Sequence, residues 1–126
     1  MLENIEVIRL AGDMAVHASR RQSLAARNIA NADTPGYRAA DLSKFSEIYS
    51  EPQALRATRR MHLGAETSRQ PVEMLDQAAR VDPNGNSVSL EREMLRTVEI
   101  RQQHDTALSI YRSTLGVLRT SLGRSR

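Results

Sequence analysis

The fold is decided at residues 28–37, which read Asn28-Ile29-Ala30-Asn31-Ala32-Asp33-Thr34-Pro35-Gly36-Tyr37. A long, alanine-rich helical pattern ends in this segment. Thr34 precedes a proline, and the clash with the proline ring disfavours the helical region for Thr34. Asn31 and Asp33 have side chains that can cap backbone groups. We therefore predict that the first helix ends near Asn31.

Pro35 and Gly36 have the chemistry of the two central positions of a type II β-turn. Proline presets φ at the first position, and glycine accepts the positive φ that the second position requires. Tyr37 follows as an anchor with an apolar ring and a polar tip. The turn fixes the direction in which the chain leaves the helix.

Upstream of the turn, residues 5–31 contain good helix formers and no proline. The positions near one face carry mostly small side chains, which let helix backbones approach closely. This pattern favours packing between long helices over filling a globular core. The predicted stripe consists of Ile5, Ile8, Gly12, Ala15, Ser19, Ala26 and Ile29.

Residues 82–87 form a second turn signal, Asp82-Pro83-Asn84-Gly85-Asn86-Ser87. Ser87 or Ser89 can cap a following helix, and Glu91 and Glu93 fall where the helix dipole favours negative charge. Spacings of four and three residues then mark a seam that is polar in its first half and apolar in its second. The seam consists of Leu90, Met94, Thr97, Arg101, His104, Leu108, Tyr111, Leu115, Leu118 and Leu122.

The second helix, which we expect to end near Gly123, is too long for a globule of this size. Roughly 34 helical residues span about 50 Å, whereas a compact chain of this length has a radius of gyration of about 14 Å. One Phe, three Tyr and no Trp would also make a thin core. We predict a mainly α fold: an elongated, antiparallel, coiled-coil-like pair of long terminal helices with an irregular middle segment.

We divide the chain into four segments. The N-terminal helix occupies residues 1–33, the turn and connector 34–45, the irregular middle segment 46–86 and the C-terminal helix 87–123. Inside the middle segment we expect a helical turn or two over Ser46–Gln53 and a small extended piece at His62-Leu63.

Composition gives little support for binding nucleic acid. The net charge is only +3, and every basic residue except Lys44 is an arginine, a bias that interface chemistry or a GC-rich genome explains equally well. The main rival from another class is an arginine-rich helical binder in which Arg20-Arg21 and Arg59-Arg60 contact phosphates. A soluble helical hairpin acting as an adaptor or export regulator is a second rival.

Enzyme chemistry is not expected. His17, His62 and His104 lack the paired spacing of a metal site, and the sequence has no phosphate-cradling loop or nucleophile elbow. Cysteine is absent, which excludes disulfides. We therefore predict no catalytic residue, cofactor, metal or small-molecule substrate. The first residues have neither a basic region nor a continuous apolar stretch, so we expect no cleaved signal peptide and no membrane span.

Residues 23–37, followed by Asp41 and Phe45, resemble the N-terminal signature of the flagellar rod and hook family of axial proteins. Residues 84–94 are similar to the segment that opens the C-terminal helix in that family. Hook and distal-rod members carry a large inserted domain that this chain is too short to hold. The resemblance therefore favours the small proximal-rod members, with another small rod subunit as the alternative.

Within the second signature, Ser87 and Ser89 stand where Asn and Asp are more usual, and both are competent caps. The middle segment matches the family poorly. For Asn28, Asn31 and Tyr37, a purely local role in capping and packing competes with a role in partner contact, and the two roles can coexist. The signature residues are Asn28, Ile29, Asn31, Asp33, Thr34, Pro35, Gly36 and Tyr37.

The resemblance implies a bacterial basal-body component of the rod, located in the periplasmic space and exported by the flagellar type III apparatus. Its implied partners are other rod subunits, further copies of itself in a helical assembly, and the basal-body adaptor and membrane ring proteins. Nucleic acid is not among them. The predicted assembly interface consists of Ile5, Ile8, Gly12, Ala15, Leu24, Leu90, Met94, Leu108, Tyr111, Leu115, Leu118 and Leu122.

Overall fold

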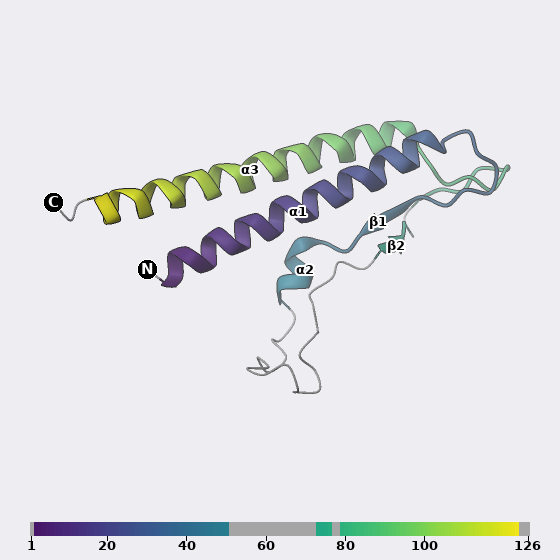
Figure 1. Ribbon diagram of the computed structural model, residues 1–126. Helices are drawn as coiled ribbons and strands as arrows, with labels where there is room; N and C mark the ends of the chain where they lie inside the picture. The colour runs from purple at the N-terminus through teal and green to yellow at the C-terminus, as the bar shows by residue number, and fades with distance from the viewer. Residues whose placement is uncertain (1, 51–72, 77–78, 124–126) are drawn as a thin grey trace.

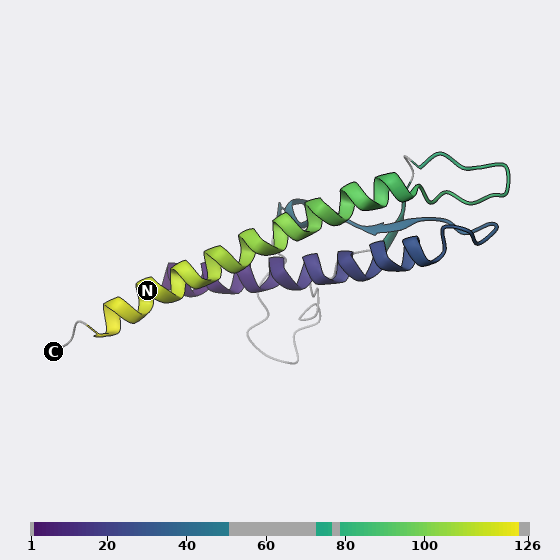
Figure 2. The same ribbon diagram turned by 90° about the horizontal axis from the view of Figure 1, so that it is seen from above.

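The computed structural model describes residues 2–50, 73–76 and 79–123 (Figure 1). Two long helices run antiparallel and side by side, with both termini at the same end (Figures 1 and 2). The predicted elongated helical pair is confirmed. The elements in order are α1 (Leu2–Ala30), β1 (Ala40–Leu42), α2 (Phe45–Ser50), β2 (Glu73–Leu75) and α3 (Leu90–Gly123).

The contact between α1 and α3 is built on small side chains spaced seven residues apart. Ala11, Ala18 and Ala25 are 2%, 0% and 1% exposed, and Ile100 of α3 packs with the last two. Ala107 is the other fully buried apolar residue of α3. Alanine at each heptad step lets the two backbones approach closely. The prediction that small side chains form the helix contact is therefore confirmed, although the positions differ.

The residues that make this contact differ from the predicted stripe by about one position. On α1, Ile5, Ser19, Ala26 and Ile29 are exposed, whereas Ile8, Gly12 and Ala15 are half-buried. The predicted stripe therefore lies beside the true contact, which also includes the buried polar residue Asn28.

On α3, the predicted seam follows the contact with α1 only in part, and Thr97 and His104 of its first half are half-buried. Leu108, Leu115 and Leu118 are half-buried, as a face toward α1 requires. In the first half, Met94 and Arg101 are exposed, and Glu93 and Ile100, each one position earlier, are buried instead. Leu90, Tyr111 and Leu122 are also exposed.

A short connector layer lies along α1 (Figure 1). β1 and β2 pair antiparallel with Asp41 opposite Met74. This two-stranded sheet was not predicted, because strands of three residues are too short to show alternation. The predicted helical turn from Ser46 is confirmed by α2, while the end of that prediction at Gln53 and the extended piece at His62-Leu63 lie outside the described residues.

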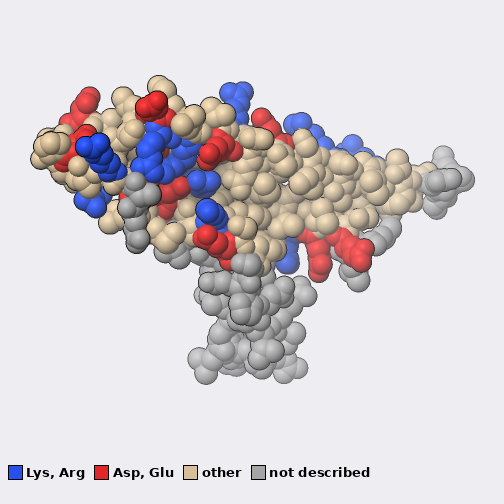
Figure 3. All heavy atoms as spheres, turned by 180° about the vertical axis from the view of Figure 1, so that it is seen from behind, with Lys and Arg blue, Asp and Glu red and all other residues tan. Residues whose placement is uncertain are grey.

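Charged groups of both signs gather near the end of the molecule that carries the turns (Figure 3). Arg21, one of the arginines considered for phosphate binding, pairs with Asp41 at 2.7 Å. Arg59 and Arg60 lie outside the described residues. Within residues 2–50, 73–76 and 79–123, no helix combines the length and apolarity needed to cross a bilayer.

Replacing Ala18 with leucine tests the close helix contact. Ala18 is completely buried, so we expect the added volume to lower the free energy of unfolding by about 1–3 kcal/mol. Urea denaturation followed by circular dichroism measures this loss. Ala26→Leu is the matched control, because Ala26 is exposed on the same helix. Equal losses for the two variants would contradict the assignment of the contact face.

Candidate functional site

The first signature turn has the predicted geometry. The Tyr37 amide donates to the Thr34 carbonyl at 3.3 Å, and Gly36 has φ of 73°, as the second central position of a type II turn requires. Asn31 caps the helix end, since its Nδ2 donates to the Arg27 carbonyl at 2.8 Å. Thr34 in turn donates its hydroxyl to Asn31 Oδ1 at 3.3 Å.

The second signature turn closes directly onto the first. Asn86, 1% exposed, places its Nδ2 at 3.0, 2.7 and 2.8 Å from the carbonyl oxygens of Asn31, Ala32 and Thr34. Its Oδ1 accepts from the Val88 amide at 2.7 Å. One carboxamide therefore binds three carbonyls of the turn that follows α1 and ties the two turns together. Sequence reasoning treated the two turns as separate and missed Asn86.

Backbone contacts reinforce this closure. The Gly36 amide donates to the Asn84 carbonyl at 3.0 Å. Gly85 has φ of 81°, and a Cβ on it would lie 3.2 Å from Gly36 Cα, so glycine serves both the conformation and the close approach. The two turns form one structural unit.

Asn28 is the centre of the junction between α1, the connector and α3. Its side chain is fully buried. Nδ2 donates to the Ala40 carbonyl at 2.9 Å and to Glu93 Oε2 at 3.2 Å. Oδ1 accepts from the Tyr37 hydroxyl and from the Ala40 amide, both at 3.2 Å. These four bonds use both donors and both lone pairs of the amide.

Glu93 lies in the first turn of α3, as predicted, where the helix dipole favours negative charge. It is also only 2% exposed, which was not predicted. Besides Asn28, it accepts from Arg96 Nη1 at 2.5 Å. Partners on α1 and on its own helix compensate the buried carboxylate, so Glu93 also joins the two helices at the junction.

Arg96 extends this cluster to the connector. Its Nη2 lies 2.7 Å from Asp76 Oδ2 and its Nε 3.3 Å from Asp41 Oδ2. Arg21 binds Asp41 through two bonds of 2.9 and 2.7 Å. Burial alone would raise the pKa of Asp41, but the hydrogen bonds and charge of Arg21, with the charge of Arg96, hold that pKa below its usual value.

The predicted cap Ser87 is also reassigned. Its amide donates to the Tyr37 carbonyl at 3.0 Å, and its hydroxyl oxygen accepts from the Ala39 amide at 2.8 Å. Ser87 thus joins the turn unit to the strand that leads into β1. α3 begins at Leu90, which leaves Ser89 in the cap position, with its carbonyl accepting from the Glu93 amide at 3.0 Å.

The predicted interface residues divide into two groups. Met94, Leu122 and Ile5 are 65%, 66% and 56% exposed, whereas Leu24 is only 8% exposed and offers little surface in the single chain. Other exposed apolar residues of α1 and α3 lie off the predicted stripe and seam. On these two helices they are Val7, Val16, Leu95, Val98, Ile110 and Val117.

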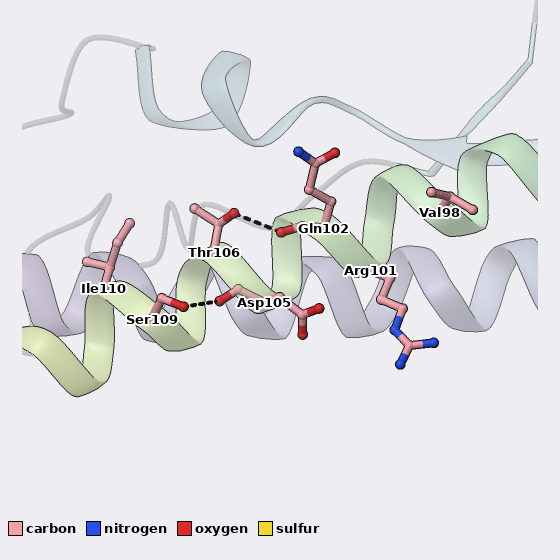
Figure 4. Close-up of a pocket in the computed structure, with 7 residues that line it drawn as sticks. All are labelled: Val98, Arg101, Gln102, Asp105, Thr106, Ser109 and Ile110. Carbon is pink, nitrogen blue, oxygen red and sulfur yellow. Dashed lines mark hydrogen bonds between the residues drawn. The ribbon is translucent and has the colours of Figure 1, made fainter.

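A shallow, open groove on the outer side of α3 lies among these residues (Figure 4). Val98 and Ile110 lie at its two ends, and Arg101 points outward. The hydroxyls of Thr106 and Ser109 donate to carbonyls of their own helix. In the described part of the chain, no three His, Asp or Glu side chains are placed to hold a metal ion.

Comparison with known proteins gives the family. The family model described as flagella basal body rod protein matches residues 16–38. FlgB of Agrobacterium fabrum is 34% identical over 119 residues, which cover 89% of each chain. FlgB of Escherichia coli K12 is 33% identical over 102 residues, covering 72% of this chain and 74% of its own. The chain belongs to the FlgB family of flagellar basal body rod proteins.

The match to the family model covers the part of the junction that α1 and the first turn contribute. Residues 16–38 include Asn28, Arg21 and the whole type II turn. The resemblance to flagellar axial proteins is thereby confirmed, and the FlgB assignment makes the chain a structural rod protein. What the individual signature residues do in the assembled rod stays a prediction.

Asn28→Asp is the sharpest test of the junction. The change keeps the shape of the side chain but puts a carboxylate beside Glu93 and removes both donated bonds. We expect a loss of about 3–5 kcal/mol in the free energy of unfolding at pH 7. A buried, like-charged carboxyl has a raised folded pKa, so part of the loss should be recovered as pH falls toward 5. Urea titrations at both pH values measure it.

Asn84→Asp is the control for this experiment. Asn84 is exposed, and its Oδ1 accepts from the Asn86 amide, a bond that aspartate can also accept. We expect a change within about 0.5 kcal/mol. If Asn28→Asp were as mild as this control, Asn28 would not hold the junction.

Proposed function

We propose that this chain is a subunit of the proximal part of the flagellar rod and that it polymerises through α1 and α3 with copies of itself and with other rod subunits. The carrying observation is the apolar surface on the outer faces of both long helices. Ile5 and Val16 on α1, and Met94, Leu95 and Val98 on α3, are each more than half exposed. In a monomeric helical pair, these exposed apolar side chains add no free energy of burial.

Burial of this surface gives assembly its driving force. At roughly 25 cal/mol per Å², several hundred Å² of apolar surface contribute on the order of 10 kcal/mol before the costs of ordering. Contacts that join different faces of successive subunits do not close into a ring but generate a helix. The interface is therefore heterologous, and torque passes along the packed helices.

The location and remaining partners follow from the same proposal. The subunit acts in the periplasmic space after export by the flagellar type III apparatus without a cleaved signal, and it contacts the adaptor and membrane ring proteins of the basal body. Membership of the FlgB family supports this route. The role is structural rather than catalytic.

Ile5→Glu tests the predicted assembly face. Ile5 is 56% exposed near the N-terminus of α1, where a negative charge favours the helix. We expect the monomer to keep its circular dichroism spectrum, while rod incorporation, measured in basal bodies purified from a strain carrying only this variant, falls at least about tenfold. That fall equals about 1.4 kcal/mol of lost contact free energy.

Val7→Glu supplies the matched control. Val7 is 37% exposed, two residues away, and it is not among the predicted interface residues. We expect near-normal incorporation. The proposed face would be wrong if Val7→Glu blocked incorporation and Ile5→Glu did not.

Gly36→Val tests the turn. A Cβ at Gly36 would meet no atom within 4 Å, but φ is 73°, so the damage comes from backbone strain alone. We expect export of the variant and failure of rod growth, scored as loss of swimming. Asparagine tolerates positive φ, so Gly36→Asn should retain most motility. Normal swimming of the valine variant would refute the role of the turn.

A further inference from the structure

His17 joins α1 to the connector that leads into α2. It is 3% exposed. Its Nε2 donates to the Ser43 carbonyl at 2.9 Å, and its ring lies 5.5 Å from the ring of Phe45. Phe45 in turn contacts Tyr49 at 5.1 Å. One imidazole therefore holds both the backbone before α2 and the first aromatic residue of α2.

The other nitrogen of this ring has no hydrogen-bond partner among the described residues. Nδ1 is buried, and within residues 2–50, 73–76 and 79–123 it makes no hydrogen bond. With Nε2 donating, Nδ1 carries the lone pair of the neutral ring. Protonation would place an N–H without an acceptor, and a positive charge, in a site closed to water. The packing is thus built for the neutral imidazole.

We propose that His17 is an acid-sensitive latch, which fixes residues 43–50 against α1 when neutral and releases them when Nδ1 takes up a proton. This device is separate from the assembly proposal, because it concerns contacts inside one chain. Release would uncover the face of α1 that carries His17, which is 3% exposed in the closed state. The connector is therefore a strap whose hold depends on pH.

The charges around His17 set the direction of the effect. Burial is the largest cause, and it lowers the pKa of His17 from 6.5. The hydrogen bond to Ser43 opposes this effect and raises the pKa. Among the nearby charges, Arg21 lowers the pKa, Asp41 raises it and Arg20 lowers it, and the net change is a decrease. The carboxylate of Asp41 is already paired with Arg21 and Arg96. It therefore stabilises a protonated His17 only weakly.

The remaining ionisable groups of the strap are Lys44, Glu47 and Tyr49. The Glu47 carboxylate accepts from the Lys44 amide at 3.3 Å, so it caps α2. Asp41 stays ionised through the relevant range, because its pKa lies below the usual value. His17 is therefore the group of this contact that changes charge between pH 5 and 6.5.

Linkage gives the pH range. A folded pKa below the unfolded value means that the released state binds the proton more tightly, so the latch is fully stable above about pH 6.5. Its stability falls as pH drops toward the folded pKa. The equilibrium for release rises by at most about tenfold per pH unit, because one proton is taken up.

The test uses the full chain and reads His17 and the strap together by NMR between pH 7.5 and 5. We expect the His17 ring to titrate below pH 6.5. Over the same range, hydrogen-exchange protection factors, corrected for intrinsic rates, should fall for the amides of Glu47 and Ile48, which donate to the Lys44 carbonyl. Protection within α3 should stay constant. Strap protection that does not follow the His17 titration would overturn the proposal.

Two variants complete the experiment. His17→Gln keeps a donor for Ser43 but cannot titrate, so strap protection should become independent of pH. His104→Gln removes a half-exposed imidazole on α3 and should leave the acid response intact. A response that survives in His17→Gln contradicts the latch. If His17→Gln loses strap protection at every pH, the wild-type data decide the question. The latch then requires that the His17 titration and the loss of strap protection have the same pH dependence in the wild-type chain.

Discussion

The structure depends on the requirement that the buried carboxamide of Asn28 keep all four of its hydrogen bonds. Its partners come from the turn, β1 and α3, so a small rotation of α1 would leave buried polar groups unpaired. Each unpaired group would cost about 1–3 kcal/mol. This requirement sets the rotation of α1 about its axis, places Ala18 and Ala25 against Ile100, and decides which apolar side chains face outward.

Local chemistry accounts for what the sequence could predict. The stop near Asn31, the turn at Pro35 and Gly36 and the long terminal helix each follow from residues adjacent in the chain. The phase of the helix contact does not, because it depends on the bond between Asn28 and Glu93, which are 65 residues apart in the chain. Asn86 was missed for a related reason: its three carbonyl partners are more than fifty residues away.

The buried charges at the junction serve geometry more than stability. Removing Glu93 and Arg96 from water costs several kcal/mol per ion, and their attraction often returns no more than that cost. Apolar residues of similar size would pack as well but would tolerate several rotations. The hydrogen-bonded cluster of Arg21, Asp41 and Arg96 is satisfied in only one rotation of the helices. It also fixes the connector to both helices. A drive-shaft subunit needs that defined angle.

The turn end of the molecule is closed within one chain. There, the hydrogen bonds of Asn86 and the close approach of Gly85 to Gly36 join the two turns. Exposed apolar side chains, in contrast, lie along both long helices. Ile5 and Leu122 lie toward the end with the termini (Figure 1), and Met94, Leu95 and Val98 lie near the start of α3. A neighbour that covers these helix faces gains the burial that the single chain lacks, while the joined turns keep the helix angle constant from subunit to subunit.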